Sequence, residues 1–236
     1  MAIKNSPYLS VDPLVLDTRE GYNLWSKKYD EELNILIKLE EENFLPDICG
    51  VEFSNALDLG CGTGRMSYWL HEQNPDAQIT AIDFSEGMLE KAREKKKAEK
   101  ITWIKSDLLK PFPVGDAKYD LIVSTLVIEH VKSFSQFFTN IRQAAGKNSS
   151  VFISGLHPSC FLVGISARFT DHETSRHILP QSFEHSISDV FNAARESGFE
   201  FVKLGEFKIT EPFVERFPKA QKYLGLPLLF TIQLKG

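Results

Sequence analysis

The segment that most constrains the fold of this chain is a short apolar run that ends in three alternating glycines, Ala56-Leu57-Asp58-Leu59-Gly60-Cys61-Gly62-Thr63-Gly64-Arg65. A second apolar run follows and ends in a lone acid, Asp83, within Ala81-Ile82-Asp83-Phe84. A strand that leads into a glycine-rich turn, with a carboxylate at the end of the next strand, is typical of a nucleoside-cofactor site in an open parallel sheet. The sequence therefore predicts an α/β fold that binds a nucleoside.

The spacing of the glycines distinguishes between cofactors. Dinucleotide-binding turns follow the pattern G-x-G-x-x-G, in which the third glycine lets the helix pack closely on the strand and the helix N-terminus holds the pyrophosphate. Here Arg65 occupies the position of that third glycine. Asp58, at the start of the turn, would also repel a phosphate and attract an ammonium group. The turn therefore favours a nucleoside that carries a zwitterionic amino acid.

Strand and helix patterns alternate from residue 54 onward, which predicts right-handed crossovers and a parallel sheet. The expected strands cover 54–59, 78–83, 101–105, 119–125, 151–155, 199–207 and 226–234. The expected helices cover 64–73, 86–97, 135–145 and 187–196. Residues 1–53 precede the first strand, and residues 156–184 are too many for an ordinary connection. Both stretches are therefore candidate walls or lids of a substrate pocket.

Further motifs follow the glycine turn and Asp83 in order, namely Ser106-Asp107-Leu108 and Tyr119-Asp120-Leu121-Ile122-Val123-Ser124-Thr125-Leu126-Val127-Ile128-Glu129-His130-Val131. Together these four elements resemble the class I S-adenosylmethionine-dependent methyltransferases of the small-molecule type, the domain 11 and 25 groups. The resemblance implies a Rossmann-like sheet of seven strands, mostly parallel, with helices on both faces. It also implies that the last strand is antiparallel and inserted beside its predecessor, and that the product of the cofactor is S-adenosylhomocysteine.

Length and composition fit one domain over residues 1–236, because 42% hydrophobic and 25% charged residues are ordinary values for a globular protein of this size. Within that domain we expect an N-terminal helical cap over 1–53 and a cofactor-binding core over 54–156. A lid insertion over 157–184 and a C-terminal helix with strands over 185–236 complete the expected organisation.

The resemblance places the cofactor contacts at the carboxyl ends of the strands. Glycines in the turn would let the backbone approach the methionine part of the cofactor, where any β-carbon would collide. Asp83 would accept hydrogen bonds from both ribose hydroxyls. The implied contacts in the core are Asp58, Gly60, Gly62, Gly64, Asp83, Phe84, Met88, Asp107, Leu108, Thr125 and Leu126. For Phe84 and Met88, simple core packing is an equal alternative to contact with adenine.

Three aromatic residues precede the core, Tyr22, Trp25 and Tyr29. Their offsets of three and seven place them near one face of a helix that we expect from about residue 20 to residue 40. They resemble the Y-x-x-W-x-x-x-Y-D element that covers the cofactor in many small-molecule methyltransferases. A purely structural aromatic stripe is an equal alternative.

Histidines are the candidate general bases, because deprotonation of a hydroxyl or an acidic carbon assists methyl transfer. His157 is the first choice, since it leaves the fifth strand over the expected transfer site, and His130 and His185 follow. Each of them could instead be a hydrogen-bonded structural residue. His172 and His177 lie in a polar stretch whose spacing matches no metal template, so we expect a surface loop there and no metal.

Charge and cysteine content limit the partners and the compartment. A net charge of -5 does not favour nucleic acid, and the basic run 93–97 closes an expected helix where cations face water. No uncharged stretch reaches the roughly 20 residues of a bilayer span, and three cysteines without C-x-x-C spacing fit a reducing compartment. We therefore expect a cytoplasmic monomer or homodimer that acts on a small molecule, with no nucleic acid or membrane as partner.

Several functions remain open at this point. The main hypothesis is methyl transfer to oxygen, nitrogen or carbon of a small organic molecule, with secondary metabolism as its expected setting. A macromolecule methyltransferase is an alternative, although Ser124-Thr125-Leu126-Val127 replaces the N/D-P-P-Y run of enzymes that methylate nucleobase amines. A cofactor-binding protein of the same fold with a regulatory or non-methyl-transfer role is another. A dehydrogenase is disfavoured by Arg65.

Overall fold

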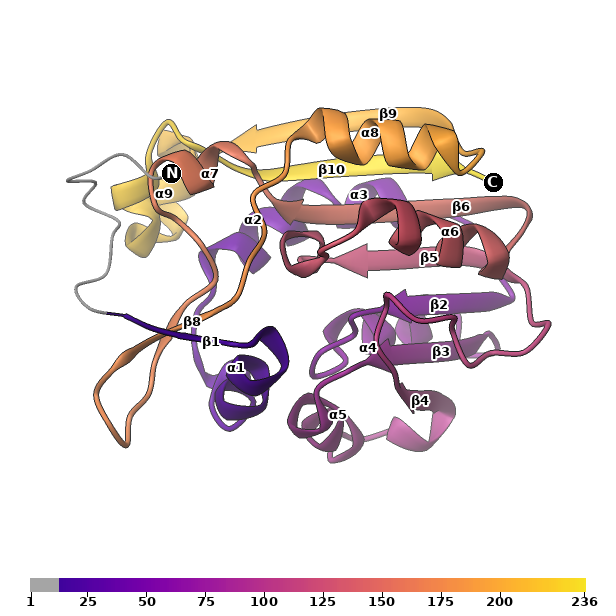
Figure 1. Ribbon diagram of the computed structural model, residues 1–236, viewed down its shortest axis with the longest axis horizontal. Coiled ribbons are helices and arrows are strands. Elements are labelled where there is room, and N and C mark those ends of the chain that lie inside the picture. The colour runs from indigo at the N-terminus through magenta and orange to yellow at the C-terminus, as the bar shows by residue number, and fades with distance from the viewer. Residues whose placement is uncertain (1–12) are drawn as a thin grey trace.

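The computed structural model describes residues 13–236, and a seven-stranded sheet runs through its centre (Figure 1). The strand order is β4-β3-β2-β5-β6-β10-β9. The bounds are β2 (Asn55–Leu59), β3 (Gln78–Asp83), β4 (Ile101–Lys105), β5 (Tyr119–Thr125), β6 (Ala145–Leu156), β9 (Glu200–Lys208) and β10 (Pro227–Lys235). The strands from β4 to β6 are parallel, and β10 pairs antiparallel with both β6 and β9. The expected Rossmann-like fold is confirmed, with the last strand inserted beside its predecessor.

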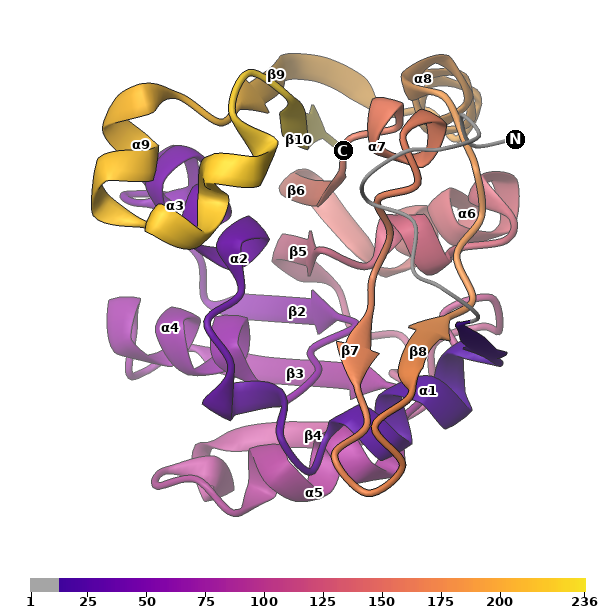
Figure 2. The same ribbon diagram turned by 90° about the vertical axis from the view of Figure 1, so that its left-hand side faces the viewer.

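Helices cover both faces of the sheet because its central strands are apolar on both sides. One face carries α6 (Phe134–Ala144) and α8 (Ile187–Glu196), which bury Phe137, Phe138 and Val190 against the strands. The other face carries α3 (Leu45–Ile48), α4 (Arg65–Gln73) and α5 (Glu86–Arg93). Figures 1 and 2 show the two helical layers on opposite sides of the sheet. Two hydrophobic cores result, one under each layer.

The carboxyl edge of the parallel strands is covered by segments from two distant parts of the chain (Figure 2). Helix α1 (Thr18–Trp25) lies there beside a small sheet of β1 (Leu14–Leu16), β7 (Phe169–Thr170) and β8 (His177–Pro180). Strand β1 pairs parallel with β8, and β7 pairs antiparallel with β8. The N-terminal stretch and the 156–184 stretch, both expected as walls or lids, therefore meet over this edge.

A third core joins the N-terminal and C-terminal parts of the chain. Helix α2 (Ile35–Asn43) packs through Ile35 and Leu39 against Phe213 of α9 (Glu211–Arg216) and Ala220 of the 3₁₀ helix η4 (Pro218–Tyr223). Helix α7 (Ser159–Leu162) adds the buried Cys160 to this cluster. The shorter 3₁₀ helices are η1 (Tyr29–Glu31), η2 (Ala98–Lys100) and η3 (Ile128–His130).

The expectation of one helix from residue 20 to residue 40 is wrong. Helix α1 ends at Trp25, the chain passes through η1, and α2 begins at Ile35. The physical reason is a second helix start, because the Asn34 side chain accepts hydrogen bonds from the backbone N–H groups of Leu36 and Ile37. The helix expected over 86–97 also ends earlier, at Arg93, and Lys97 adopts a left-handed backbone conformation (φ 67°).

Two hydrogen bonds join helix α1 to the N-terminus of α5. Asn23 Oδ1 accepts hydrogen bonds from Ser85 Oγ at 2.7 Å and from the backbone N–H of Gly87 at 3.1 Å. A β-carbon at Gly87 would lie 2.5 Å from Ser26 Oγ, so a larger residue would push the two helices apart. Helix α1, which covers the carboxyl edge, is therefore bound to α5, the helix that follows Asp83.

Replacing Asn23 by alanine is expected to loosen this cover. Two hydrogen bonds contribute about 1–2 kcal/mol to the local stability, so amide hydrogen exchange in α1 should accelerate by about tenfold while exchange in β5 stays unchanged. Hydrogen-exchange mass spectrometry measures both. Asn43→Ala is the matched control, since within residues 13–236 the Asn43 side chain bonds only the Leu39 carbonyl of its own helix. Equal acceleration in the two variants would contradict the assignment.

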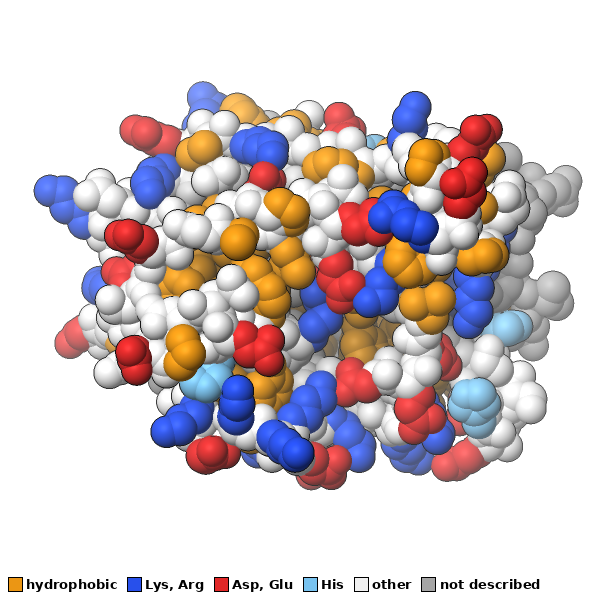
Figure 3. Space-filling view, turned by 180° about the vertical axis from the view of Figure 1, so that it is seen from behind, with side chains coloured by type: hydrophobic (Ala, Val, Ile, Leu, Met, Phe, Trp, Pro, Cys, Tyr) orange, Lys and Arg blue, Asp and Glu red, His pale blue; other side chains and the backbone are white. Residues whose placement is uncertain are grey.

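No helix among residues 13–236 is long and apolar enough to cross a membrane. On the face shown in Figure 3, lysine and arginine side chains are interspersed with aspartate and glutamate. That face therefore carries no extended basic field of the kind that a nucleic acid requires.

Candidate functional site

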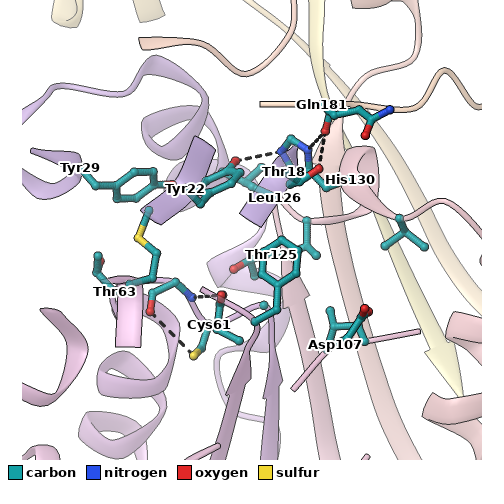
Figure 4. Close-up of a pocket in the computed structure, with 18 of the residues that line it drawn as sticks. Thr18, Tyr22, Tyr29, Cys61, Thr63, Asp107, Thr125, Leu126, His130 and Gln181 are labelled. Atoms are coloured by element: carbon teal, nitrogen blue, oxygen red, sulfur yellow. Dashed lines mark hydrogen bonds between the residues drawn. The ribbon is translucent and has the colours of Figure 1, made fainter. Parts of the chain in front are cut away.

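A cavity of about 360 Å³ lies at the carboxyl edge of the sheet, under α1 (Figure 4). Its floor is the glycine turn after β2, and the ends of β3, β4 and β5 form its sides. The cavity is lined by most of the residues that the sequence implicates, including Tyr22, Tyr29, Gly60, Gly62, Asp83, Phe84, Met88, Asp107, Leu108, Thr125, Leu126 and His130. It is also lined by Thr18 and Gln181, which the sequence analysis did not identify.

The glycine turn has the shape of a cradle. Gly60, Gly62 and Gly64 have φ values of 74°, 55° and 84°, a region that residues with a β-carbon rarely adopt. A β-carbon at Gly60 would lie 2.9 Å from Val127 Cγ1 and closer still to Cγ2, whereas the same position at Gly62 meets open space. Gly64 lies outside the cavity lining and packs against Trp103. The backbone at Gly62 therefore borders the cavity directly, and a ligand can approach it.

A Gly60→Ala variant tests this cradle. The substitution combines a left-handed backbone with a collision against Val127, so it should lower the free energy of unfolding by about 2 kcal/mol or more. Denaturant unfolding measures the loss. Gly115→Ala is the control, because Gly115 has φ 60° but a β-carbon added there would meet no atom within 4 Å, so that only the backbone penalty of about 1–2 kcal/mol remains. A smaller loss at Gly60 than at Gly115 would refute the crowding.

Asp83 links the turn to the end of β3. Its Oδ2 accepts a hydrogen bond from the Gly62 N–H at 2.9 Å, and its Oδ1 accepts one from the Ser85 N–H at 2.8 Å. Burial raises the pKa of Asp83 to about 6, although the backbone donors oppose the rise. Carboxylate oxygens have further lone pairs, so hydroxyl donors entering the cavity can still bind this side chain.

Asp58 lies beneath the turn and does not line the cavity. Its Oδ2 accepts a hydrogen bond from Ser67 Oγ at 2.5 Å, and its Oδ1 has no partner among the described residues. Burial raises the pKa of Asp58 to about 7. The structure therefore places a carboxylate behind the glycine turn, without direct access to the cavity.

The opposite end of the cavity is apolar with an acidic edge. Phe84 and Met88 follow β3, and Asp107 and Leu108 follow β4. Arg19 of α1 stands over the Phe84 ring at 5.3 Å and lies 3.9 Å from Asp107 Oδ2. An apolar lining with a carboxylate acceptor beside it suits an adenine ring that carries an amino group.

Tyr22, His130 and Gln181 form a hydrogen-bonded row along one wall (Figure 4). His130 Nδ1 is 2.8 Å from the Gln181 carbonyl oxygen, which only accepts, so Nδ1 carries the proton. His130 Nε2 therefore accepts the hydrogen bond from the Tyr22 hydroxyl at 2.9 Å. Burial lowers the pKa of His130 to about 4, which keeps the imidazole neutral. This histidine positions Tyr22, and both of its ring nitrogens are engaged.

The other two candidate histidines lie outside the cavity. His157 follows β6, but its Nε2 is 2.7 Å from Glu206 of β9 and its Nδ1 is 2.7 Å from Ser159 Oγ. The expectation that His157 lies over the transfer site is therefore wrong, because these partners hold its ring toward β9. His185 Nε2 bonds the Val131 carbonyl, and its ring packs 4.1 Å from that of Phe134.

A second cavity, of about 290 Å³, adjoins the first. Tyr22, Tyr29 and Leu126 line both cavities and form the wall between them. Trp25 lines the second cavity rather than the first. The remaining walls come from α2, the segment 165–168, η4 and the start of β10. The sequence could not reveal this cavity, since its walls come from separate segments spread between Tyr22 and Leu228.

Glu129 is the buried acid of the second cavity. Its Oε2 is 3.5 Å from the backbone nitrogen of Leu156, and burial raises its pKa to about 7. Its charge contributes to the raised pKa values of Tyr22 and Tyr29, which places it near the shared wall. Sequence reasoning included Glu129 in the fourth-strand motif but selected its neighbour His130, because burial is not visible in that motif.

The described residues contain no group of three or more histidine, cysteine, aspartate or glutamate side chains arranged to hold a metal ion. The cavity instead fits a nucleoside that carries an amino acid, because it combines an open glycine cradle, a carboxylate beside it and an apolar slot. Fold and site together define a class I S-adenosylmethionine-dependent methyltransferase.

Comparisons with known proteins show the family. Residues 57–153 match the model of a methyltransferase domain. An uncharacterized methyltransferase of Emericella nidulans, AN0656, is 31% identical over 92% of this chain and 90% of its own length. The chain belongs to the S-adenosylmethionine-dependent methyltransferase family, is an enzyme of that family and uses S-adenosylmethionine as its cofactor.

Two further matches concern the core and the fold. The malonyl-[acyl-carrier protein] O-methyltransferase of Anoxybacillus flavithermus is 30% identical over 42% of this chain and 37% of its own length. The crystal structure of an S-adenosylmethionine-dependent methyltransferase from Mesorhizobium loti superposes with a TM-score of 0.70. That pair is 22% identical and covers 86% of this chain and 100% of the other, so it shows a shared fold.

Proposed function

We propose that this enzyme transfers the methyl group of S-adenosylmethionine to an oxygen, nitrogen or carbon atom of a small organic molecule bound in the second cavity. The observation that carries the proposal is the shared wall: Tyr22, Tyr29 and Leu126 border both cavities. A donor in one cavity and an acceptor in the other would meet at these three residues. Juxtaposition of two reactants in a fixed geometry is a large source of rate enhancement.

The cofactor contacts proposed for this chain are the residues that line the first cavity. Asp83 would hold the ribose hydroxyls, and the backbone of Gly60 and Gly62 would border the methionine part. Phe84 and Met88 would flank the adenine, whose edge Asp107 and Leu108 would bind. Asp58 and Gly64 support the turn from behind, since neither lines the cavity.

When bound, S-adenosylmethionine would supply an electrophilic methyl group to a lone pair of the acceptor, with S-adenosylhomocysteine as the leaving group. Tyr22 and Tyr29 exclude water from the shared wall and present aromatic faces and hydroxyls to a cationic centre. Leu126, with φ 57°, follows β5 at the same wall. Glu129 takes the proton from a hydroxyl or acidic carbon of the acceptor, because a base with a pKa near the working pH is the most effective.

The comparisons support methyl transfer and leave the acceptor to be proposed. Malonyl-[acyl-carrier protein] relatives suggest an alternative, an acceptor attached to a carrier protein. The size of the second cavity, about 290 Å³, favours a free small molecule. The free cysteines Cys49, Cys61 and Cys160 support the cytoplasmic setting that we propose. A monomer or homodimer, with no nucleic acid or membrane partner, remains part of the proposal.

Two measurements test this function. Isothermal calorimetry should detect binding of S-adenosylhomocysteine, and a screen of small hydroxyl- and amine-bearing compounds with labelled S-adenosylmethionine should find a methylated product. A Leu126→Trp variant, which fills the shared wall, should abolish methylation of that compound. Cofactor binding without any methylated product would favour a regulatory role, and methylation only of carrier-bound compounds would favour the alternative.

A further inference from the structure

The second cavity has an unusual concentration of positive charge for an otherwise apolar space. Arg168, Lys219 and Lys222 line it, whereas its acids are Glu32 and the buried Glu129. The cations come from two elements, the segment before β7 and the 3₁₀ helix η4. Burial raises the pKa of Glu129 to about 7, so this carboxyl is only partly ionised at neutral pH and adds less negative charge to the cavity. The cavity is therefore electrostatically suited to a negatively charged guest.

Arg168 is held in place within this wall. Its Nη2 donates a hydrogen bond to the Gly164 carbonyl at 2.6 Å, and its Nε donates one to the Ser166 carbonyl at 3.3 Å. Ile165 and Ala167, on either side of Ser166, make the surroundings apolar. Burial lowers the pKa of Arg168. Because the two backbone carbonyls fix the guanidinium in the cavity wall, an anion in the cavity could meet it without any movement of the side chain.

The cation and the buried acid come from different elements of the cavity wall. Glu129 belongs to η3 and lies beside the backbone nitrogen of Leu156, whereas Arg168 bonds the carbonyls of Gly164 and Ser166. The charge of Glu129 contributes to the raised pKa values of Tyr22 and Tyr29 in the shared wall. A molecule that spans the cavity would thus meet a cation at one end and the proton acceptor at the methyl-transfer end.

Trp25 adds an aromatic surface to the same wall. It lines the second cavity, and its ring stacks on that of Phe169 at 4.9 Å. A flat apolar group of a bound molecule could pack against this surface.

We propose that the second cavity binds an acceptor with an anionic group, a carboxylate or a phosphate monoester, which Arg168 recognises with support from Lys219 and Lys222. The apolar body of the acceptor would lie against Leu156, Ile165 and Leu228. Its methylated atom would lie near Leu126 and Glu129. This inference rests on the proposed function, because it assigns a substrate class to the same acceptor site.

The test uses three probes with a common apolar body: 4-phenylbutanoate, 3-phenylpropyl phosphate and the uncharged 4-phenylbutanamide. Dissociation constants are measured by saturation-transfer NMR on the full chain saturated with S-adenosylhomocysteine. At least one anionic probe should bind about tenfold more tightly than the amide, and the tighter of the two anions identifies the preferred group. Arg168→Gln should remove this preference, whereas Arg168→Lys should retain part of it.

Arg195→Gln is the matched control, because Arg195 is an exposed arginine on α8 that lines neither cavity. Arg168→Gln should bind S-adenosylhomocysteine as wild type does, since Arg168 does not line the first cavity. If that variant fails to fold, the double variant Lys219→Gln, Lys222→Gln should lower the affinity for the anion several-fold. Equal binding of anions and amide, or no binding of either anion, would overturn the anionic assignment. Failure to bind S-adenosylhomocysteine would instead overturn the proposed function.

Discussion

Asp83→Ala is expected to weaken S-adenosylhomocysteine binding by tenfold or more. Asp83 accepts hydrogen bonds from Gly62 and Ser85, and we propose that it also binds the ribose hydroxyls. Loss of charge-assisted hydrogen bonds costs about 1.5–3 kcal/mol, which corresponds to about 10- to 150-fold in affinity. Isothermal titration calorimetry with wild type and variant measures the difference.

Asp120→Ala is a matched control for this experiment. Asp120 also accepts two backbone hydrogen bonds, from the N–H groups of Ser54 and Asn55, but it lies at the start of β5 and does not line the first cavity. The control should bind S-adenosylhomocysteine within about twofold of wild type. If Asp83→Ala also bound as tightly as wild type, the assignment of the ribose contact would be lost.

Glu129→Gln is expected to lower kcat by about 10²- to 10⁴-fold, the usual contribution of a general base. The substitution keeps the size of the side chain but removes its ability to take a proton. In wild type the rate should rise with pH through about 7, because the ionised form of Glu129 is the active one and its pKa is raised to that value. In the variant this ascending limb should disappear. Steady-state kinetics with labelled S-adenosylmethionine and the acceptor found by the screen measure both effects.

Two control measurements distinguish the loss of a general base from a structural effect of the Glu129→Gln substitution. Glu129 does not line the first cavity, so the variant should bind S-adenosylhomocysteine as wild type does. His157→Gln, the second control, should turn over within about twofold of wild type, because His157 lies outside both cavities. Normal turnover by Glu129→Gln, or loss of the pH limb in His157→Gln instead, would show that the base is misassigned.

Most residues that line the first cavity, which we propose for the cofactor, could be predicted from the sequence because their positions follow from local features of the chain. Gly60 and Gly62 follow one strand and Asp83 ends the next, and parallel strands bring their carboxyl ends to one edge. Ser85, expected as the start of a helix, accepts a hydrogen bond from the Met88 N–H as a capping residue does. The division of the chain into cap, core, lid and C-terminal part stays a prediction.

The choice among the histidines could not be made from the sequence. His130, His157 and His185 all follow elements near the carboxyl edge, and the chain direction of a few residues decides which ring enters the cavity. Glu206 of β9 holds His157, and Val131 holds His185. Only His130 reaches Tyr22, which is 108 residues away along the chain.

The sequence by itself determined the α/β architecture, the cofactor and most of the residues that line the first cavity, since each depends on short-range spacing along strands and turns. Tertiary structure alone decided where the second cavity lies, which we propose for the acceptor, because its walls combine α1, the segment before β7 and η4. Our proposal of Glu129 instead of a histidine as the base also depends on tertiary structure, since burial and the raised pKa that follows from it depend on the packing of distant segments. Local periodicity gives no information about such long-range contacts, so the position of the second cavity and the burial of Glu129 are visible only in the folded chain.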